Sequence, residues 1–211
     1  MRAGFSRLAV VTALSSSLLL GGPARAADVP TDMAKRALEL CKLGRDAATR
    51  EVRERHFQDG LALAERAVGL DDRCAEAHFA VFCNLGESLR LDGEQISSYF
   101  EFRRMMSELD ATLALEPNHA EALASKGILL VRLPRLLGGD AEHGEKLLKR
   151  VIELDPRAVT SRLTLAEQCR LRGETAEAAA YAQRALAIAS EQGRTDKVAE
   201  AQSLLAKIES D

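Results

Sequence analysis

Histidine and cysteine are the residue types in this 211-residue chain best suited to catalysis or metal binding. Cys74 and His78 are four residues apart and share a predicted helix face, but two ligands do not complete a zinc site. None of the histidines has the H-E-x-x-H spacing that places two zinc ligands and a base on one helix face. The four histidines are His56, His78, His119 and His143. We therefore expect no catalytic centre, no metal site and no cofactor.

A glycine pattern in the stretch LPRLLGGDAEHGEKLLKRVIELDP, residues 133–156, is a second candidate for chemistry. Gly139 and Gly144 satisfy the spacing G-x-x-x-x-G of a phosphate-binding loop. However, Glu145 stands where that loop requires lysine, no serine or threonine follows it, and the neighbouring carboxylates would repel a phosphate. The stretch therefore predicts no nucleotide site.

The same stretch predicts a break between two helices. Pro134 disfavours helical geometry in the residue before it, so a helix should end near Arg132. The glycine pair allows backbone angles that other residues avoid, and Asp140 suits the N-cap of the next helix. We expect Leu136 and Leu137, which are too apolar for an idle surface loop, to fold back onto the helices.

Composition favours an all-α domain of ordinary size. The chain is 46% apolar but only 4% aromatic, and it has no tryptophan. Its alanine and leucine content suits helix packing better than a sheet. The net charge is −3 and no run of one sign stands out, which argues against nucleic acid as a partner.

The N-terminal residues have the order of a secretory signal peptide. In MRAGFSRLAVVTALSSSLLLGGPARAADVP, two arginines precede an apolar run at residues 8–20, and Ala24-Arg25-Ala26 forms a small-x-small site. We expect cleavage after Ala26, which removes residues 1–26 and leaves residues 27–211 as a periplasmic or secreted protein without a membrane span. An uncleaved anchor is the alternative, because the run approaches the lower limit of a span. No cysteine follows the run until Cys41, so a lipid-attachment site is absent.

Three segments share one pattern of small and apolar residues: GLALAERAVGL from Gly60, GEKLLKRVIEL from Gly144 and AAAYAQRALAI from Ala178. The offsets of 4, 3 and 3 residues within each pattern mark one face of a helix. A looser fourth copy, MMSELDATLALEP, begins at Met105. The last residues of the four copies lie 45, 39 and 34 residues apart, at Leu70, Leu115, Leu154 and Ile188.

The 34-residue spacing and the terminal L-D-P resemble the tetratricopeptide repeat (TPR) family. The resemblance implies an α-solenoid of about four helix-turn-helix repeats, roughly residues 41–74, 75–119, 120–158 and 159–192, with a sealing helix at 195–210. Gly60 and Gly144 depart from the family, which prefers alanine there. The first repeat is the weakest, because residues 41–55 carry many charges; it is either a capping repeat or part of one longer helix beginning near Thr31.

The resemblance also implies a peptide-binding groove lined by the first helix of each repeat. Mapped onto this sequence, the expected partner-binding residues are Phe79, Cys83, Ile128, Arg132, Leu163 and Glu167. Phe79, Ile128 and Leu163 should then be exposed. The same positions are equally consistent with packing between repeats. The Lys and Asn clamp of chaperone-binding TPR proteins is missing.

The function expected from this resemblance is that of a non-catalytic, exported adaptor or scaffold that binds a protein or peptide. The long link L-P-x-L-L-G-G-D also resembles a link in exported TPR proteins, including the TPR component associated with TRAP transporters. The alternative is therefore a periplasmic ligand-binding or accessory component of a transport system. The adaptor should have an open groove, whereas the ligand-binding component should have an enclosed apolar cavity.

The four cysteines have no CxxC spacing, so they are either free thiols or members of disulfides. Cys41 and Cys74 occupy nearly equivalent places in successive repeats of the implied solenoid. If one bridge forms, this pair is the one expected.

An insertion near residues 91–106 lengthens the second repeat, and a helix is expected from Gln95 or Ser97 to Leu115. Tyr99, Phe100 and Phe102 cluster in it. Their rings either fill the core or form a partner-binding edge.

Overall fold

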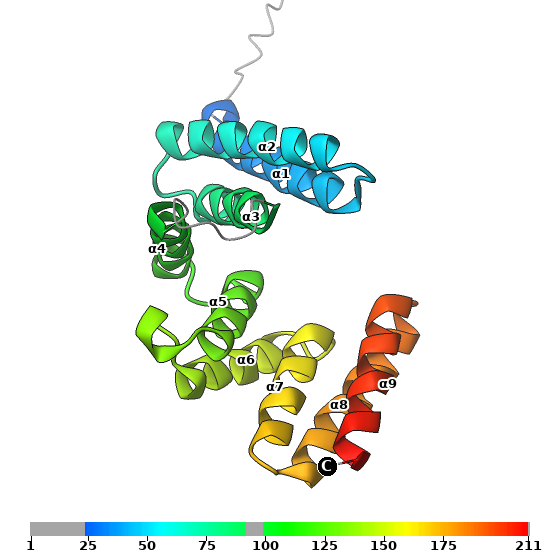
Figure 1. The fold of residues 1–211 in the computed structure, drawn as a ribbon. Coiled ribbons are helices and arrows are strands. Elements are labelled where there is room, and N and C mark those ends of the chain that lie inside the picture. Colours follow the sequence, from blue (N-terminus) through cyan, green and yellow to red (C-terminus); the bar gives the residue numbers. More distant parts are fainter. Residues whose placement is uncertain (1–23, 92–98, 211) are drawn as a thin grey trace, which may run out of the picture.

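The structure is a computed structural model that describes residues 24–91 and 99–210 (Figure 1). Within these ranges the chain forms nine α-helices, one short 3₁₀ helix and no strand. The helices are α1 (Ala24–Asp46), α2 (Arg50–Leu70), α3 (Ala75–Leu91), α4 (Tyr99–Leu115), α5 (Ala120–Arg132), η2 (Arg135–Leu137), α6 (Ala141–Leu154), α7 (Val159–Leu171), α8 (Thr175–Glu191) and α9 (Thr195–Ser210). Consecutive helices pack on one another, so the all-α prediction is confirmed.

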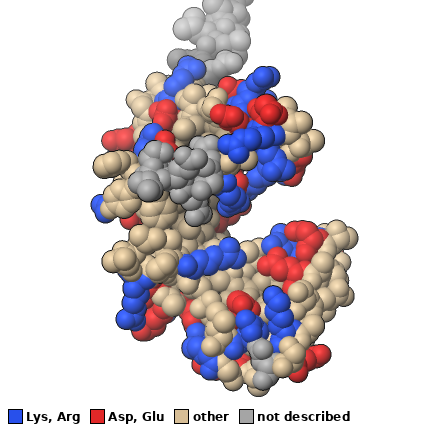
Figure 2. Space-filling view, in the orientation of Figure 1, with Lys and Arg blue, Asp and Glu red and all other residues tan. Residues whose placement is uncertain are grey.

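The helices form a curved array that is open on one side. Figure 1 shows α1 to α4 at one end and α6 to α9 at the other, with α5 between them. Figure 2 shows the surface hollowed on the open side, with charged side chains of both signs along the two edges of the hollow. None of the described helices combines the length and the hydropathy needed to cross a membrane.

Short turns closed by side chains separate the helices. Thr49 caps α2 and Asp140 caps α6, and each side chain accepts a hydrogen bond from the backbone N–H three residues on, at 3.4 and 3.0 Å. Asp71 and Asp155 follow α2 and α6, and their carboxylates accept from the N–H two residues on, at 3.0 and 2.8 Å. These polar residues therefore fix where helices begin and end.

The repeated pattern marks the buried face of α2, α4, α6 and α8. Its first three positions are buried in every copy, from Gly60, Met105, Gly144 and Ala178 onward. The fourth position differs: Leu70 is 63% exposed and Leu115 and Leu154 are partly exposed, whereas Ile188 is buried. The three exposed leucines are the last residues of their helices, while Ile188 lies three residues before the end of α8. The last residue of α2, α4 and α6 therefore extends beyond the part of the helix that packs on its neighbours.

Gly60 and Gly144 stand at close contacts between helices. A Cβ added to Gly60 on α2 would lie 2.2 Å from Oδ1 of Asn84 on α3. A Cβ added to Gly144 on α6 would lie 2.7 Å from the carbonyl oxygen of Gly127 on α5. Alanine, which the TPR family prefers at these two positions, would collide with the neighbouring helix.

The first helix pair agrees in part with the alternative of one longer helix. α1 runs through Thr31 to Asp46, so residues 41–46 belong to a long helix, but this helix begins at Ala24 rather than near Thr31. Residues 50–55 belong to α2, which follows the turn at residues 47–49. The segment expected as a signal peptide, residues 1–26, lies mostly outside the described residues. α1 packs on α3 through alanines that are 0% exposed, namely Ala34 and Ala37 on α1 and Ala77 and Ala80 on α3.

The link between α5 and α6 has the predicted ends but not the predicted tip. α5 ends at Arg132, Asp140 caps α6, and Gly138 adopts a left-handed conformation with φ of 89°. The expectation that Leu136 and Leu137 fold back was wrong, because they are 95% and 54% exposed. Backbone hydrogen bonds from residues 139 and 140 to the residues before η2 close the base of the link and leave its tip in solvent.

The insertion before α4 lies partly outside the described residues, and so does the expected helix start at Gln95 or Ser97. From Tyr99 onward the helix runs to Leu115 as predicted. Phe102 packs against a buried cluster of Leu85, Leu89 and Met105, whereas Tyr99 and Phe100 are 53% and 81% exposed. Phe102 therefore fills the core as the first alternative predicts, and the partner-binding edge stays a prediction for the exposed rings of Tyr99 and Phe100.

Candidate functional site

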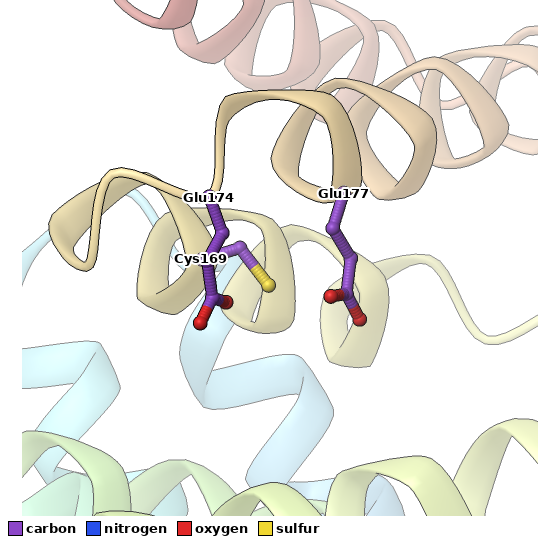
Figure 3. Close-up of side chains that lie close together, drawn as sticks. All are labelled: Cys169, Glu174 and Glu177. Atoms are coloured by element: carbon purple, nitrogen blue, oxygen red, sulfur yellow. The ribbon is translucent and has the colours of Figure 1, made fainter.

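One cluster of potential metal ligands lies where α7 turns into α8. The thiol of Cys169 and the carboxylates of Glu174 and Glu177 have ligand atoms within 4.8 Å of one another. Figure 3 shows the three side chains pointing to the same side of the turn. Cys169 is buried near the end of α7, Glu174 precedes α8, and Glu177 lies in the first turn of α8.

The neighbourhood of this cluster already supplies a cation. Arg172 donates hydrogen bonds to both carboxylate oxygens of Glu174 at 3.0 and 2.8 Å, and to the Cys169 sulfur at 3.6 Å. Burial raises the pKa of Cys169 to about 11, so without a bound cation the thiol stays protonated near neutral pH. Glu177 faces the positive end of the α8 dipole. The ion pair of Arg172 with Glu174 and the place of Glu177 in the first turn of α8 account for the cluster without a metal.

A groove between α5, α7 and α9 is the better candidate for a binding site. Its volume is about 490 Å³, and it is open to solvent. The lining residues are Val131 and Arg132 from α5, Leu163, Thr164, Glu167, Gln168 and Leu171 from α7, and Glu200, Ser203, Leu204 and Lys207 from α9. Three helices that are not consecutive in sequence therefore build one concave surface.

The groove has an apolar floor. Leu163 and Leu204 are buried in it, at 3% and 7% exposure, and Val131 is half-buried. Leu171, at the last residue of α7, is 63% exposed at its edge. A ligand with an apolar side chain can therefore cover Leu171 and contact the floor without any rearrangement of the helices.

The acidic residues of the groove form ion pairs, whereas two of its basic residues form none within the described part of the chain. Glu167 pairs with Arg170 at 2.9 Å, and Glu200 pairs with Lys197 at 2.5 Å. Arg132 and Lys207 are exposed and form no ion pair with any residue that the structure describes. The two acids are paired within the protein, so Arg132 and Lys207 are the lining charges most available to a ligand.

The structure brings half of the predicted partner-binding residues to this groove. Arg132, Leu163 and Glu167 line it. Ile128 is half-buried on α5 and is not among the lining residues. The expected exposure of Leu163 was wrong, because α9 packs over α7 and covers it.

Phe79 and Cys83, the other two predicted residues, are buried in the core between α1, α3, α4 and α5. They are 3% and 8% exposed. The ring of Phe79 packs against His119, with the ring centroids 4.7 Å apart. The expectation that Phe79 is exposed was therefore wrong, because the start of α5 covers it.

The sequence reasoning missed Leu171 and all the residues of α9. α9 had been expected only to seal the end of the array, but Glu200, Leu204 and Lys207 form one wall of the groove. Their spacing of four and three residues places them on one helix face, which is the pattern that predicts a shared surface.

A second hollow, of about 400 Å³, lies between the start of α1 and the turn from α2 to α3. Most of its lining is charged, including Lys35, Asp71, Arg73, Glu76 and Glu116. It has no apolar floor comparable with Leu163 and Leu204, so it carries no ligand hypothesis.

The structure overturns the expected pairing of Cys41 with Cys74. The Cys74 sulfur lies 3.9 Å from the hydroxyl oxygen of Thr31, near the start of α1. Cys41 is ten residues further along that helix, a distance of about 15 Å. A disulfide cannot span that separation.

Comparison with known proteins adds no identity to these observations. No family model and no curated protein matches this chain. The groove is therefore interpreted from its own residues.

Proposed function

We propose that this protein is an exported, non-catalytic adaptor of the TPR type that binds a segment of a partner protein in the groove between α5, α7 and α9. The observation that carries the proposal is the combination of an apolar floor with two cations, Arg132 and Lys207, that have no partner among the described residues. The four-copy sequence pattern and the pairwise packing of helices support a solenoid of about four repeats.

The chemistry of the groove favours an acidic, amphipathic peptide. Apolar side chains of such a segment would cover Leu171 and the floor, and its carboxylates would pair with Arg132 and Lys207. A small solute is less well matched, because the groove is open and its floor is only partly enclosed by the three helices. The role in a transport system therefore remains the second candidate, as a partner-binding accessory subunit.

The test compares the unmodified protein with two variants of the groove. In the first, Arg132→Glu and Lys207→Glu reverse both cations; in the second, Leu171→Asp places a charge at the apolar edge. All three side chains are exposed, so folding should be retained and is checked by circular dichroism. The matched control is Lys42→Glu with Arg66→Glu, which makes the same charge change at exposed positions of α1 and α2.

Affinity capture from the exported fraction, followed by mass spectrometry, measures the outcome. A partner that binds the unmodified protein and the control but is lost from both groove variants supports the proposal. Binding of that partner should also weaken as salt is raised, because the two cations attract it. Identical partners from all four proteins, or a partner lost equally from the control, would refute binding in this groove.

A further inference from the structure

Helices α1 and α3 lie side by side and run in the same direction. Near the middle of α1, the Asn84 side-chain amide donates a hydrogen bond to the carbonyl oxygen of Ala37 at 3.1 Å. Near the end of α1, Arg45 donates to the carboxylate of Glu87 at 2.7 Å. The two contacts occur in the same order along both helices, so the helices are parallel, and the contact of Arg45 with Glu87 sets a local register of 42 residues between them.

Cys41 and Cys83 face each other within this register. Cys41 lies one turn before Arg45, and Cys83 lies one turn before Glu87. Both thiols belong to one buried cluster, and they are 1% and 8% exposed in it. The interaction of the two thiols lowers the pKa of Cys41 and raises that of Cys83. Their shared cluster and the register of α1 on α3 place the two thiols beside each other.

The interface around this pair allows the backbones to approach. α1 and α3 meet through alanines that are 0% exposed, among them Ala37 and Ala80. Small side chains bring the Cα atoms of facing residues close together, and a disulfide requires a Cα separation below about 6.8 Å. Parallel helices packed through alanine meet that requirement more readily than helices separated by large side chains.

The other two cysteines have no such neighbour. Cys74 lies beside Thr31 at the far end of α1, and Cys169 is buried between α7, α8 and α9. Among the four cysteines, all of which lie in the described ranges, Cys41 and Cys83 are the pair that shares one buried cluster.

We propose that Cys41 and Cys83 form an intramolecular disulfide that ties α1 to α3 when the folding chain meets a disulfide oxidant. One cysteine thiolate attacks a sulfur of the oxidant, for example oxidised glutathione, and releases one thiolate. The second cysteine then attacks the sulfur of its neighbour in this mixed disulfide and releases the other thiolate. The two cysteine protons end on the two released thiols, so two electrons pass from the protein to the oxidant.

The geometry of the pair does not depend on the proposed function, because the groove uses α5, α7 and α9. Only the compartment in which the oxidant is met rests on the proposed export. Failure of the groove test therefore leaves the disulfide untouched, and the reverse also holds.

The test uses the purified chain, reduced and unfolded, then refolded in a buffer of oxidised and reduced glutathione. Trypsin releases Cys41 in the peptide of residues 37–42, but it leaves Cys74 and Cys83 together in the peptide of residues 74–90. The Cys74→Ser variant removes this ambiguity. We expect most Cys74→Ser chains to yield the two peptides joined by a disulfide, and Cys169→Ser to leave the bridge unchanged.

The bridge should also be detectable without digestion. In the unfolded protein, two fewer thiols should react with an alkylating reagent. The thermal unfolding midpoint should rise by at least about 4 °C relative to the reduced chain, because the bridge closes a loop of some forty residues. The Cys83→Ser variant, with its folding checked by circular dichroism, should lose both effects.

Two outcomes would overturn the proposal. One is a Cys74→Ser chain that refolds with all its thiols reduced. The other is a bridge from Cys41 to Cys74 in the Cys83→Ser chain that forms in the same yield as the Cys41–Cys83 bridge of the unmodified protein. That result would show that the register of α1 on α3 does not select the partner of Cys41.

Discussion

The contact between Gly60 and Asn84 gives the sharpest test of the packing. The Asn84 amide is 0% exposed and donates to the carbonyl oxygens of Ala37 and Ala80, at 3.1 and 2.9 Å. Its Oδ1 atom accepts no hydrogen bond from the described residues and lies against the Cα of Gly60. Asn84 therefore joins α1 and α3 in a space that exists because residue 60 of α2 has no side chain.

Replacing Gly60 with alanine should destabilise the protein by about 3 kcal/mol. Alanine in a helix interior gains about 1 kcal/mol over glycine. Against this gain, the new Cβ would lie 2.2 Å from Oδ1, so Asn84 must move. Loss of its two hydrogen bonds costs about 0.5–1.5 kcal/mol each, and overpacking adds about 1–3 kcal/mol.

Urea unfolding followed by circular dichroism at constant m-value measures this change. The matched control is Gly69→Ala on the same helix, where an added Cβ meets nothing within 4 Å, and it should be neutral or stabilising. In combination with Asn84→Ala, the cost of Gly60→Ala should largely disappear. A stable Gly60→Ala protein, or a loss that persists without the Asn84 amide, would refute the reasoning.

Two further predictions concern a half-buried histidine and an exposed loop. Burial disfavours the charged form of His78, but hydrogen bonds to the Glu108 carboxylate at 2.6 Å and the Asp72 carbonyl at 2.9 Å outweigh it and raise its pKa. The imidazolium therefore stabilises the fold below about pH 6.5, and this stabilisation is lost as the pH rises through the raised pKa of His78. The urea unfolding midpoint, measured across this pH range, should fall accordingly, and the His78→Gln variant should not show the fall. Leu136→Ser should change the free energy of unfolding by less than about 0.5 kcal/mol, because the side chain is 95% exposed; a larger loss would mean that the tip packs on the helices after all.

Local features of the fold were predictable from the sequence because their causes are local. Pro134 and Asp140 act within one turn of their own positions, and both ends of the link were placed correctly. The pattern of offsets also identified the buried face of α2, α4, α6 and α8, because a helix of fixed period turns sequence spacing into geometry. The same reasoning failed at Leu70, where the helix ends before a neighbour can cover the side chain.

The candidate site was less predictable, because it depends on contacts between distant segments. Phe79 and Leu163 have the apolar character of either a groove or a core, and the spacing within their own helices does not distinguish the two. What decides their exposure is α5 for Phe79, through the ring of His119, and α9 for Leu163. Gly60 illustrates the same limit. The reason for glycine rather than alanine at this position is the Asn84 side chain of α3, which packs against it and cannot be placed there from the sequence.

The arrangement of the groove links its binding strength to the shape of the array. Arg132, Leu171 and Lys207, the exposed residues that the proposed partner would contact, come from three different helices. A ligand that uses all three therefore requires one particular set of angles between α5, α7 and α9. Because a ligand can shift a conformational equilibrium only by its difference in affinity between states, binding here must favour the curvature that brings the three contacts together. The proposed partner would then be recognised by the spacing of its contacts as well as by its charge.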